Sequence, residues 1–315
     1  MSIYNKILVI ADINSDEQPQ LARAVQLAEK SRSPSKVTFF LSIYDFSYDM
    51  TSMLSTDERD AMRRGMIEQR EAWMRKIAEP YLNNTFELDI IVVWHNHAYE
   101  AIIAEVFAHG HEILIKRTYE HDTLGSVIFT PTDWHLLRKC PCPVLLVKHA
   151  HWAEDSKVLA SVHVGSESET HQALNSYMVE QAQNIAERFG ATPYLVNAYP
   201  TTPANITIEL PEFDPTTYSD AVRGHHLTAM KALRQKHGLP EEQTVVEQGL
   251  PEDVIPKVAE RLNAAMVILG TTGRTGLSAV FIGNTAEHVL DKINCDVLAL
   301  KPIGYVSPLT PNEVS

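Results

Sequence analysis

The feature that most constrains the fold of this chain is an internal repeat. When residues 113–148 are aligned without gaps to the residues 153 positions later, 12 of the 36 positions are identical. Self-similarity at a fixed offset indicates that a structural unit has been duplicated. The 315 residues are also enough for two α/β domains of ordinary size. We predict two copies of one domain, residues 1–150 and residues 155–303, followed by a C-terminal tail at 304–315.

The beginnings of the two copies also align. Residues 6–18 (KILVIADINSDEQ) superpose on residues 157–169 (KVLASVHVGSESE) at an offset of 151. In this alignment Ser15 and Gln18 match Ser166 and Glu169. A serine followed three residues later by glutamine or glutamate is typical of a capping box at a helix start. We therefore predict a helix directly after the first strand of each copy.

Each copy alternates short apolar segments with segments of helical periodicity. In the second copy the predicted strands are 157–164, 192–199, 244–249, 264–270 and 296–301, and the predicted helices are 171–190, 216–238, 251–263 and 279–294. The first copy repeats this order, with a long helix at 55–80. The pattern predicts an α/β fold of two tandem doubly wound domains, each a five-stranded parallel sheet with helices on both faces. Ligands of such sheets bind at the carboxyl ends of the strands.

The composition excludes several classes of function. With 27 Lys and Arg against 40 Asp and Glu, the net charge is −13, which is unsuited to nucleic acid because that binding depends on basic side chains at phosphates. No run of 18 apolar residues is present, so we expect no membrane span. The N-terminus fits a strand better than a secretory signal. Three cysteines are too few for a disulfide framework, so we expect a soluble protein of the cytoplasm.

A glycine-rich segment follows the fourth predicted strand of the second copy. Its glycines and the two polar residues after them are Gly270, Gly273, Gly276, Gly283, Asn284 and Thr285. Glycines let backbone amides approach an anion closely, and a helix N-terminus adds partial positive charge. The spacing matches neither the Walker loop nor the Rossmann fingerprint. It indicates an anion site, with a tight turn before a capped helix as the alternative.

The pattern G-x2-G-x9-G made by Gly270, Gly273 and Gly283 resembles the nucleotide loop of the universal stress protein family. Residues 248–276 also resemble that family's passage from third to fourth strand, and the resemblance covers both copies as a tandem arrangement. It implies an adenine nucleotide alpha hydrolase-like fold. It also implies a cytoplasmic stress-response protein that acts as a ligand-binding or sensor module.

By this resemblance, the second copy would bind ATP or a related adenine nucleotide, and we expect no resident metal. The residues assigned to the nucleotide are His163, Gly249, Gly270, Gly273, Arg274, Gly283, Asn284 and Thr285. Two of them depart from the family pattern. Asn284 stands where the family has serine or threonine, and His163 stands where the family has an aspartate at the end of strand one.

The first copy keeps that aspartate, Asp12, but lacks the loop. The residues at the positions of the four glycines are Arg117, Glu120, Thr123 and Thr130. Glu120 would repel a phosphate, and Pro131, opposite Asn284, has no amide to donate. We therefore expect at most one nucleotide site in the chain, in the second copy.

Fourteen histidines include four close pairs: His95/His97, His109/His111, His149/His151 and His225/His226. A His-x-His pair can supply two zinc ligands, but the sequence does not show where further ligands would come from. His95 and His97, after the third strand of the first copy, are the metal candidates, with solvated loop histidines as the alternative. His149 and His151 fit a linker.

The cysteines fit no metal or redox motif. Cys140 and Cys142 are separated by one residue, unlike a zinc ribbon or a redox C-x-x-C motif, and Cys142 is equivalent to Cys295. We expect buried structural thiols.

The helix at 55–80 places large apolar side chains beside arginines. They are Met62, Met66, Trp73 and Met74, with Arg59, Arg63, Arg64, Arg70 and Arg75, and Met50, Met53 and Leu54 precede them. Such a stripe could hold an acyl chain and an anionic head group, or it could be core packing with a solvated far face. Segment 201–224 matches its position in the second copy. The alternative function is therefore a carrier or sensor of an amphipathic, lipid-like metabolite held between the domains.

No catalytic constellation stands out. Asp12 and Asp253 are single carboxylates that fit a turn and a helix start. We expect at most a weak ATPase. The expected partners are a small-molecule ligand and other proteins, with a pseudo-twofold monomer or a homodimer as the assembly.

Overall fold

The computed structural model describes residues 4–31, 33–47, 55–82, 85–120, 127–148, 152, 155–201, 214–271 and 284–310. They belong to two compact units. The first unit comprises Met1–Tyr119, Phe129–His151 and Val306–Ser315, and the second comprises Glu120–Ile128 and Trp152–Tyr305.

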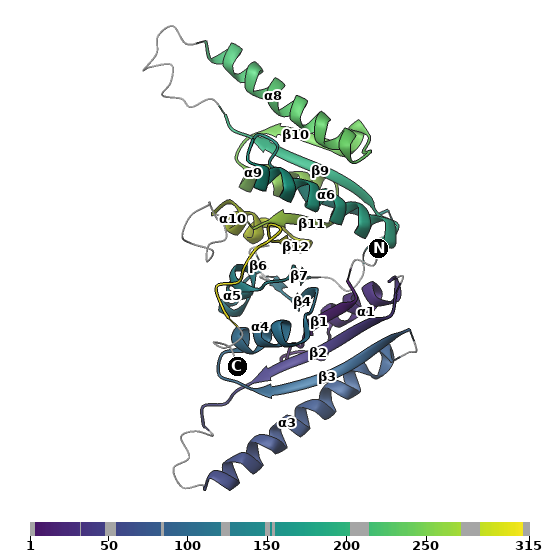
Figure 1. Ribbon diagram of the computed structural model, residues 1–315, viewed down its shortest axis with the longest axis vertical. Coiled ribbons are helices and arrows are strands. Elements are labelled where there is room, and N and C mark those ends of the chain that lie inside the picture. The colour runs from purple at the N-terminus through teal and green to yellow at the C-terminus, as the bar shows by residue number, and fades with distance from the viewer. Residues whose placement is uncertain are drawn as a thin grey trace. The chain divides into compact units, whose positions relative to one another are not determined.

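The first unit is built on a parallel sheet (Figure 1). Its elements are β1 (Lys6–Ile10), α1 (Pro19–Glu29), β2 (Ser35–Ile43), α3 (Thr56–Ala78), the short helix η1 (Glu79–Tyr81), β3 (Phe86–Trp94), α4 (Ala98–His109), β4 (Ile113–Arg117), α5 (Pro131–Lys139) and β7 (Val144–Val147). A two-residue strand, β5 (Tyr119–Glu120), follows β4. The strands pair in the order β7-β4-β1-β2-β3, and all of these pairings are parallel.

The second unit repeats this plan. Its elements are the two-residue strand β6 (Val127–Ile128), β8 (Lys157–Ser161), α6 (Glu169–Phe189), β9 (Thr192–Tyr199), α8 (Pro215–Lys236), η2 (Glu241–Gln243), β10 (Thr244–Gln248), α9 (Pro251–Arg261), β11 (Ala264–Gly270), α10 (Asn284–Lys292) and β12 (Asp296–Leu300). The order β10-β9-β8-β11-β12 is again parallel throughout. The predicted tandem of α/β domains with five-stranded parallel sheets is confirmed in the described residues.

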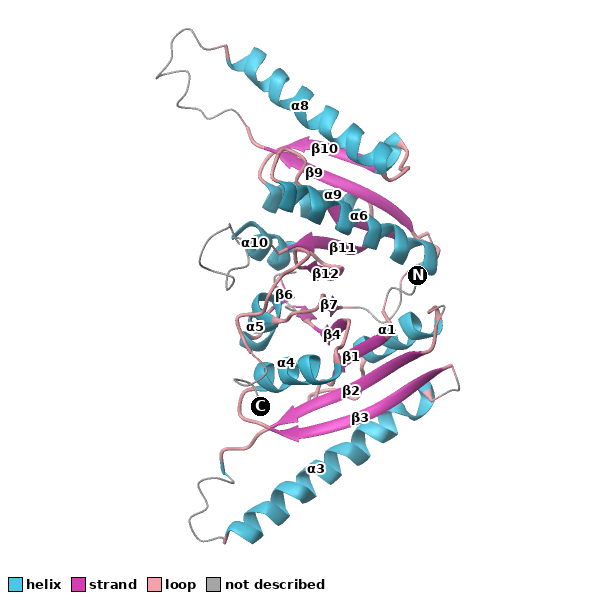
Figure 2. Cartoon of the chain, viewed as in Figure 1, coloured by secondary structure: helices cyan, strands magenta, loops and turns pink. Residues whose placement is uncertain are grey.

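Both sheets reverse their winding at the same place. From β1 the chain moves outward to β2 and β3, and then returns to β4 and β7 on the other side of β1 (Figure 2). Because crossovers between parallel strands are right-handed, α1 and α3 cover one face and α4 and α5 the other. In the second unit α6 and α8 lie opposite α9 and α10 for the same reason. The switch points, where ligands of such folds bind, lie between β1 and β4 and between β8 and β11.

The central strands are buried because helices cover both faces of each sheet. Leu8 and Leu114 in the first unit, and Leu159 and Ile268 in the second, are 0% exposed. This burial explains why the strands are almost continuously apolar in sequence, where a half-exposed sheet would alternate. Among the described residues, no helix has the length and apolar character needed to cross a bilayer.

The helices predicted after the first strands are present, but the predicted capping boxes are wrong. α1 and α6 begin at Pro19 and Glu169, and neither N-cap residue makes a side-chain cap. Ser15 Oγ instead accepts the amide of Glu17 at 3.1 Å, and Ser166 Oγ accepts the amide of Ser168 at 3.3 Å. The serines therefore stabilise a turn before each helix, because the helices start later than the motif implies.

Candidate functional site

In the first unit, an amide side chain holds the loop that follows β1. Gln18 Oε1 accepts the backbone amide of Asp12 at 2.9 Å, and Gln18 Nε2 donates to the carbonyl oxygen of the same residue at 2.8 Å. The Gln18 side chain is buried. These two bonds place Asp12 at the switch point, at the end of the strand where the sequence predicts it.

Arg117 occupies the switch point of the first unit from the end of β4. Its Nη1 atom donates to Ser15 Oγ at 3.1 Å and to the Glu17 carbonyl oxygen at 2.9 Å. The same atom lies 3.7 Å from Asp12 Oδ2. The guanidinium therefore binds the loop that a nucleotide would contact, and its charge is shared with groups of the protein itself.

The N-terminus of α5, the helix that follows β4, is capped by a carboxylate of the protein itself. Thr130 and Asp133 form a capping box at the N-terminus of α5, with Asp133 Oδ2 accepting the Thr130 amide at 2.7 Å. Asp133 is 1% exposed, and its Oδ1 atom lies 2.7 Å from Lys116 Nζ. A helix N-terminus attracts negative charge. In the first unit Asp133 meets that requirement from within the protein, and the absence of a conventional nucleotide site there stays a prediction.

In the second unit the same loop is held by an amide from a different position. Asn175, inside α6, accepts the backbone amide of His163 at 2.9 Å and donates to its carbonyl oxygen at 3.0 Å. A further amide, that of Val164, donates to Asn197 Oδ1 at 3.2 Å. His163 thus stands at the switch point with its side chain exposed.

Aromatic rings gather at this edge of the second sheet. The His226 ring, reaching in from α8, stacks on Tyr199 with ring centres 5.5 Å apart and lies 3.0 Å from Asn197 Nδ2 through its Nδ1 atom. His163 and His171 lie 5.6 Å apart, centre to centre. Burial lowers the pKa of His226, and the neighbouring His225 and His163 lower it further. Both effects favour the neutral form of the His226 imidazole.

The end of β11 carries no side chain where β4 carries Arg117. A Cβ atom on Gly270 would lie 2.7 Å from Leu174 Cδ2, so a larger residue at this position would require the leucine side chain to move. The residue equivalent to Asp133 is Ala286. The second unit therefore has neither the arginine nor the internal carboxylate that occupy the first.

The remaining residues assigned to the nucleotide are only partly described. Gly249 follows β10 with a φ of 148°, a conformation that requires glycine, and its amide donates to the Tyr199 carbonyl oxygen at 2.9 Å. Gly273, Arg274 and Gly283 lie outside the described residues, as do the side chains of Asn284 and Thr285. The site assigned to the loop stays a prediction.

The histidines proposed as metal candidates bind their own loop. His95 Nδ1 accepts the backbone amide of His97 at 3.0 Å, and His97 Nδ1 lies 3.2 Å from Glu100 Oε2. Among the described residues, neither belongs to a group of three metal-ligating side chains, whereas Glu105, His109 and His111 form one. His149 and His151 lie outside the described residues.

The cysteines are free thiols, and the prediction of buried thiols is right for two of the three. Cys140 and Cys142 are buried, with Sγ atoms 3.5 Å apart. Cys295 is partly exposed, because it lies in the turn that precedes β12.

The helix with methionines and arginines packs on the edge of the first sheet. Met74 is 0% exposed, whereas Met62 is 43% exposed. Trp73 Nε1 donates to Asp16 Oδ1 at 2.9 Å. Met50, Met53, Leu54 and residues 202–213 lie outside the described residues. The amphipathic carrier stays a prediction.

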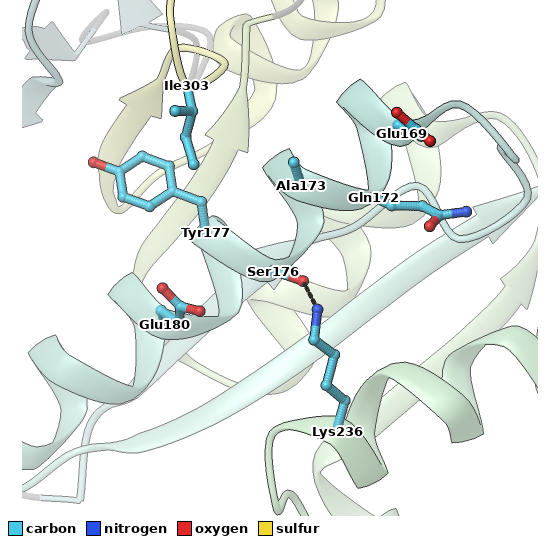
Figure 3. Close-up of a pocket in the computed structure, with 8 residues that line it drawn as sticks. All are labelled: Glu169, Gln172, Ala173, Ser176, Tyr177, Glu180, Lys236 and Ile303. Carbon is cyan, nitrogen blue, oxygen red and sulfur yellow. Dashed lines mark hydrogen bonds between the residues drawn. The ribbon is translucent and has the colours of Figure 1, made fainter.

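A groove of about 350 Å³ runs along α6 in the second unit (Figure 3). Glu169 and Glu180 line it, and Lys236 Nζ donates to Ser176 Oγ at 2.8 Å across it. Two carboxylates make it unsuited to a phosphate group.

Comparison with known proteins decides the family. The sequence model of the universal stress protein family matches residues 3–148 and 170–301. The chain belongs to the universal stress protein family. It is 54% identical over 310 residues to Universal stress protein E of Escherichia coli K12, covering 98% of both chains. It is 43% identical to a Universal stress protein E homolog of Haemophilus influenzae, covering 95% of this chain and 98% of the relative.

The fold of this universal stress protein is also found in a solved structure. A universal stress protein from Pseudomonas aeruginosa superposes with a TM-score of 0.73 and 30% identity, covering 96% of this chain and 94% of that one. The tandem arrangement of two family domains therefore extends over both proteins. The resemblance inferred from the glycine loop is confirmed at the level of the family.

Sequence reasoning missed part of the site in this universal stress protein. Lys116 and Asp133 were not recognised, although the Thr130-x-x-Asp133 spacing is that of a capping box. Arg117 was noted only as the residue in place of a glycine. Asn175 and His226 carry no local signal, since each contacts a residue outside its own helix, 12 and 29 positions away in the sequence.

Proposed function

We propose that this protein serves the stress response of the cytoplasm as a ligand-binding module, and that its second unit binds ATP or a related adenine nucleotide. The observation that carries the proposal is the difference between the two switch points. In the first unit the protein itself supplies a cation, Arg117, at the end of β4 and an anion, Asp133, at the start of α5. The second unit has Gly270 and Ala286 at the same positions.

This difference favours an external anion in the second unit. A helix start and a glycine loop attract phosphate when no carboxylate of the protein competes. Ala286 stands where Asp133 caps α5, and the acidic residue in the first turn of α10 is Glu287 instead. Gly270 places no side chain at the end of β11.

The rings at the switch point suit the base of a nucleotide. Stacking on an aromatic face contributes about 1–3 kcal/mol per base in proteins that bind nucleic acids. His163 is exposed at the end of β8, beside His171. Because no general base is assigned here, binding, with at most slow hydrolysis, is the proposed activity.

Equilibrium dialysis of the full chain against ATP tests this function. We expect saturable binding of one ATP per chain. A Gly283→Asp variant should lose it, because a carboxylate in the loop repels phosphate. The matched control is Thr130→Asp, which places an aspartate at the equivalent position of the first unit. This variant should bind ATP like the wild type. The proposal fails if the native protein shows no saturable binding, or if both variants bind ATP equally well.

A further inference from the structure

Three metal-binding side chains meet at the edge of the first sheet opposite the switch point. Glu105 and His109 lie on the last turns of α4, and His111 lies in the connection to β4. Their donor atoms all lie within 4.8 Å of one another. Neither the nucleotide loop nor its counterpart in the first unit includes these residues.

The carboxylate lies between the two rings. Glu105 Oε1 is 2.8 Å from His109 Nδ1 and 3.1 Å from His111 Nε2. Zinc binds imidazole nitrogen and carboxylate oxygen at about 2.0–2.2 Å, which in a tetrahedral site spaces the donors by roughly 3.3 Å. The two separations from Glu105 are near that value, and all three donor atoms lie within 4.8 Å of one another. Only a small shift is needed to admit a cation, and His109, whose side chain is 60% exposed, is free to make it.

The backbone positions the three groups before any ion binds. Glu105 and His109 are four residues apart on one helix, so they share a face. Gly110 then adopts a left-handed conformation, with φ 63°, and turns the chain so that His111 returns beneath the helix end. The His111 side chain is 2% exposed and that of Glu105 is 10% exposed. His111 is therefore buried, and Glu105 is mostly shielded from solvent.

The buried His111 ring directs its hydrogen-bonding nitrogen toward Glu105. His111 Nδ1 has no hydrogen-bond partner in the part of the chain that the structure describes. Its Nε2 atom faces Glu105. One basic group lies nearby: Lys6 Nζ donates to the His109 carbonyl oxygen at 3.0 Å, which fixes the helix end.

We propose that Glu105, His109 and His111 form a site for a divalent transition-metal ion, with zinc as the best match. Two nitrogens and one carboxylate oxygen suit zinc, whereas calcium and magnesium prefer oxygen ligands alone. Water completes the coordination on the exposed side of His109. The site is confined to the first copy, because the residues 153 positions later are Val258, Leu262 and Ala264.

Titration of the full chain without a histidine tag tests the site. The chain is stripped with EDTA, dialysed, and titrated with zinc chloride by calorimetry and with cobalt chloride by visible absorption. The wild type should bind zinc and develop the d–d bands of low-symmetry cobalt. His109→Ala should weaken the tightest zinc site roughly tenfold or more, since even loss of a group that only orients a ligand costs that much. Glu105→Gln should do the same and alter the cobalt spectrum.

A matched control separates this site from other histidines. His97 is also exposed and also pairs with a glutamate on α4, at 3.2 Å, so His97→Ala should leave the tightest site unchanged. Circular dichroism and the Tm of each metal-free variant check that it is folded. The proposal is overturned if the wild type binds no zinc. It is equally overturned if folded His109→Ala and Glu105→Gln bind zinc as the wild type does, or if His97→Ala weakens binding to the same extent.

Discussion

The Arg117 guanidinium donates to the hydroxyl of Ser15 across the switch point of the first unit, at 3.1 Å. The same nitrogen donates to the Glu17 carbonyl oxygen and lies close to Asp12. One side chain from β4 thus fixes the loop after β1. In the second unit glycine stands at the position of the arginine, so position 270 offers no side chain for such a contact.

Replacing Arg117 with alanine should destabilise the chain. Hydrogen bonds that involve a charged group contribute about 1.5–3 kcal/mol, so we expect the free energy of unfolding to fall by about 1–3 kcal/mol. Urea denaturation measures this loss. Arg75→Ala is the control, because its pair with Glu71 is on the surface and should contribute less than about 1 kcal/mol. Equal effects of the two variants would contradict the role given to Arg117.

Removing the lysine beside Asp133 should have a larger effect. Lys116→Met removes the cation beside the buried Asp133, and breaking a buried ion pair costs about 3–5 kcal/mol. Urea denaturation again provides the measurement, and adding Asp133→Asn should restore part of the loss. Lys36→Met removes an exposed ion pair with Asp89 and should cost no more than about 1 kcal/mol. A small effect of Lys116→Met alone would show that Asp133 needs no partner.

The loop after β8 has no room for a methyl group at Gly165. A Cβ atom there would lie 2.4 Å from Cε1 of His226, and two other ring atoms are within 3.3 Å. Gly165→Ala should therefore cost about 1–3 kcal/mol, the usual range for overpacking. Gly224→Ala, at an open position of the helix that carries His226, should stabilise by about 0.5–1 kcal/mol. Denaturation curves for both variants test this, and a neutral or stabilising Gly165→Ala would refute the packing.

Stability should fall as the solution becomes acidic, in part because of His226. Its pKa is lowered in the folded protein, mainly by burial, so the unfolded chain takes up a proton first as the pH decreases. The stabilisation from the neutral ring is present above the ordinary histidine pKa of about 6.5 and is lost as pH falls from there toward the folded-state pKa. The Tm of the wild type should therefore drop over this range. His226→Gln should show a shallower drop, and His97→Gln should follow the wild type; identical curves for all three would exclude this contribution.

Much of the fold follows from sequence, because the repeat and the apolar strands are local patterns. The strand 264–270 and the helix 251–261 agree with the predicted segments to within two residues. The capping boxes failed for a local reason: the serine hydroxyls bind amides in the turn before the helix.

The site was less accessible to sequence reasoning, because its contacts join residues distant in the chain. Arg117 and Ser15 are 102 positions apart. Arginine at the position of the first loop glycine predicts that the first unit lacks the nucleotide loop, but it does not predict which groups the guanidinium contacts. In the same way, His111 and Glu105 form a cluster only because Gly110 turns the backbone between helix and strand.

The amides that hold the two loops come from different places, Gln18 before α1 and Asn175 inside α6. Recombination between the two repeats, with the crossover at the start of α1 and α6, would therefore give two unequal hybrid domains. One would join residues 157–169 to α1 and possess neither amide. The other would join residues 6–18 to α6 and would contain both the Gln18 and the Asn175 side chains at one loop. We therefore expect neither hybrid to hold its loop as the parent units do, although the strands of the two units match.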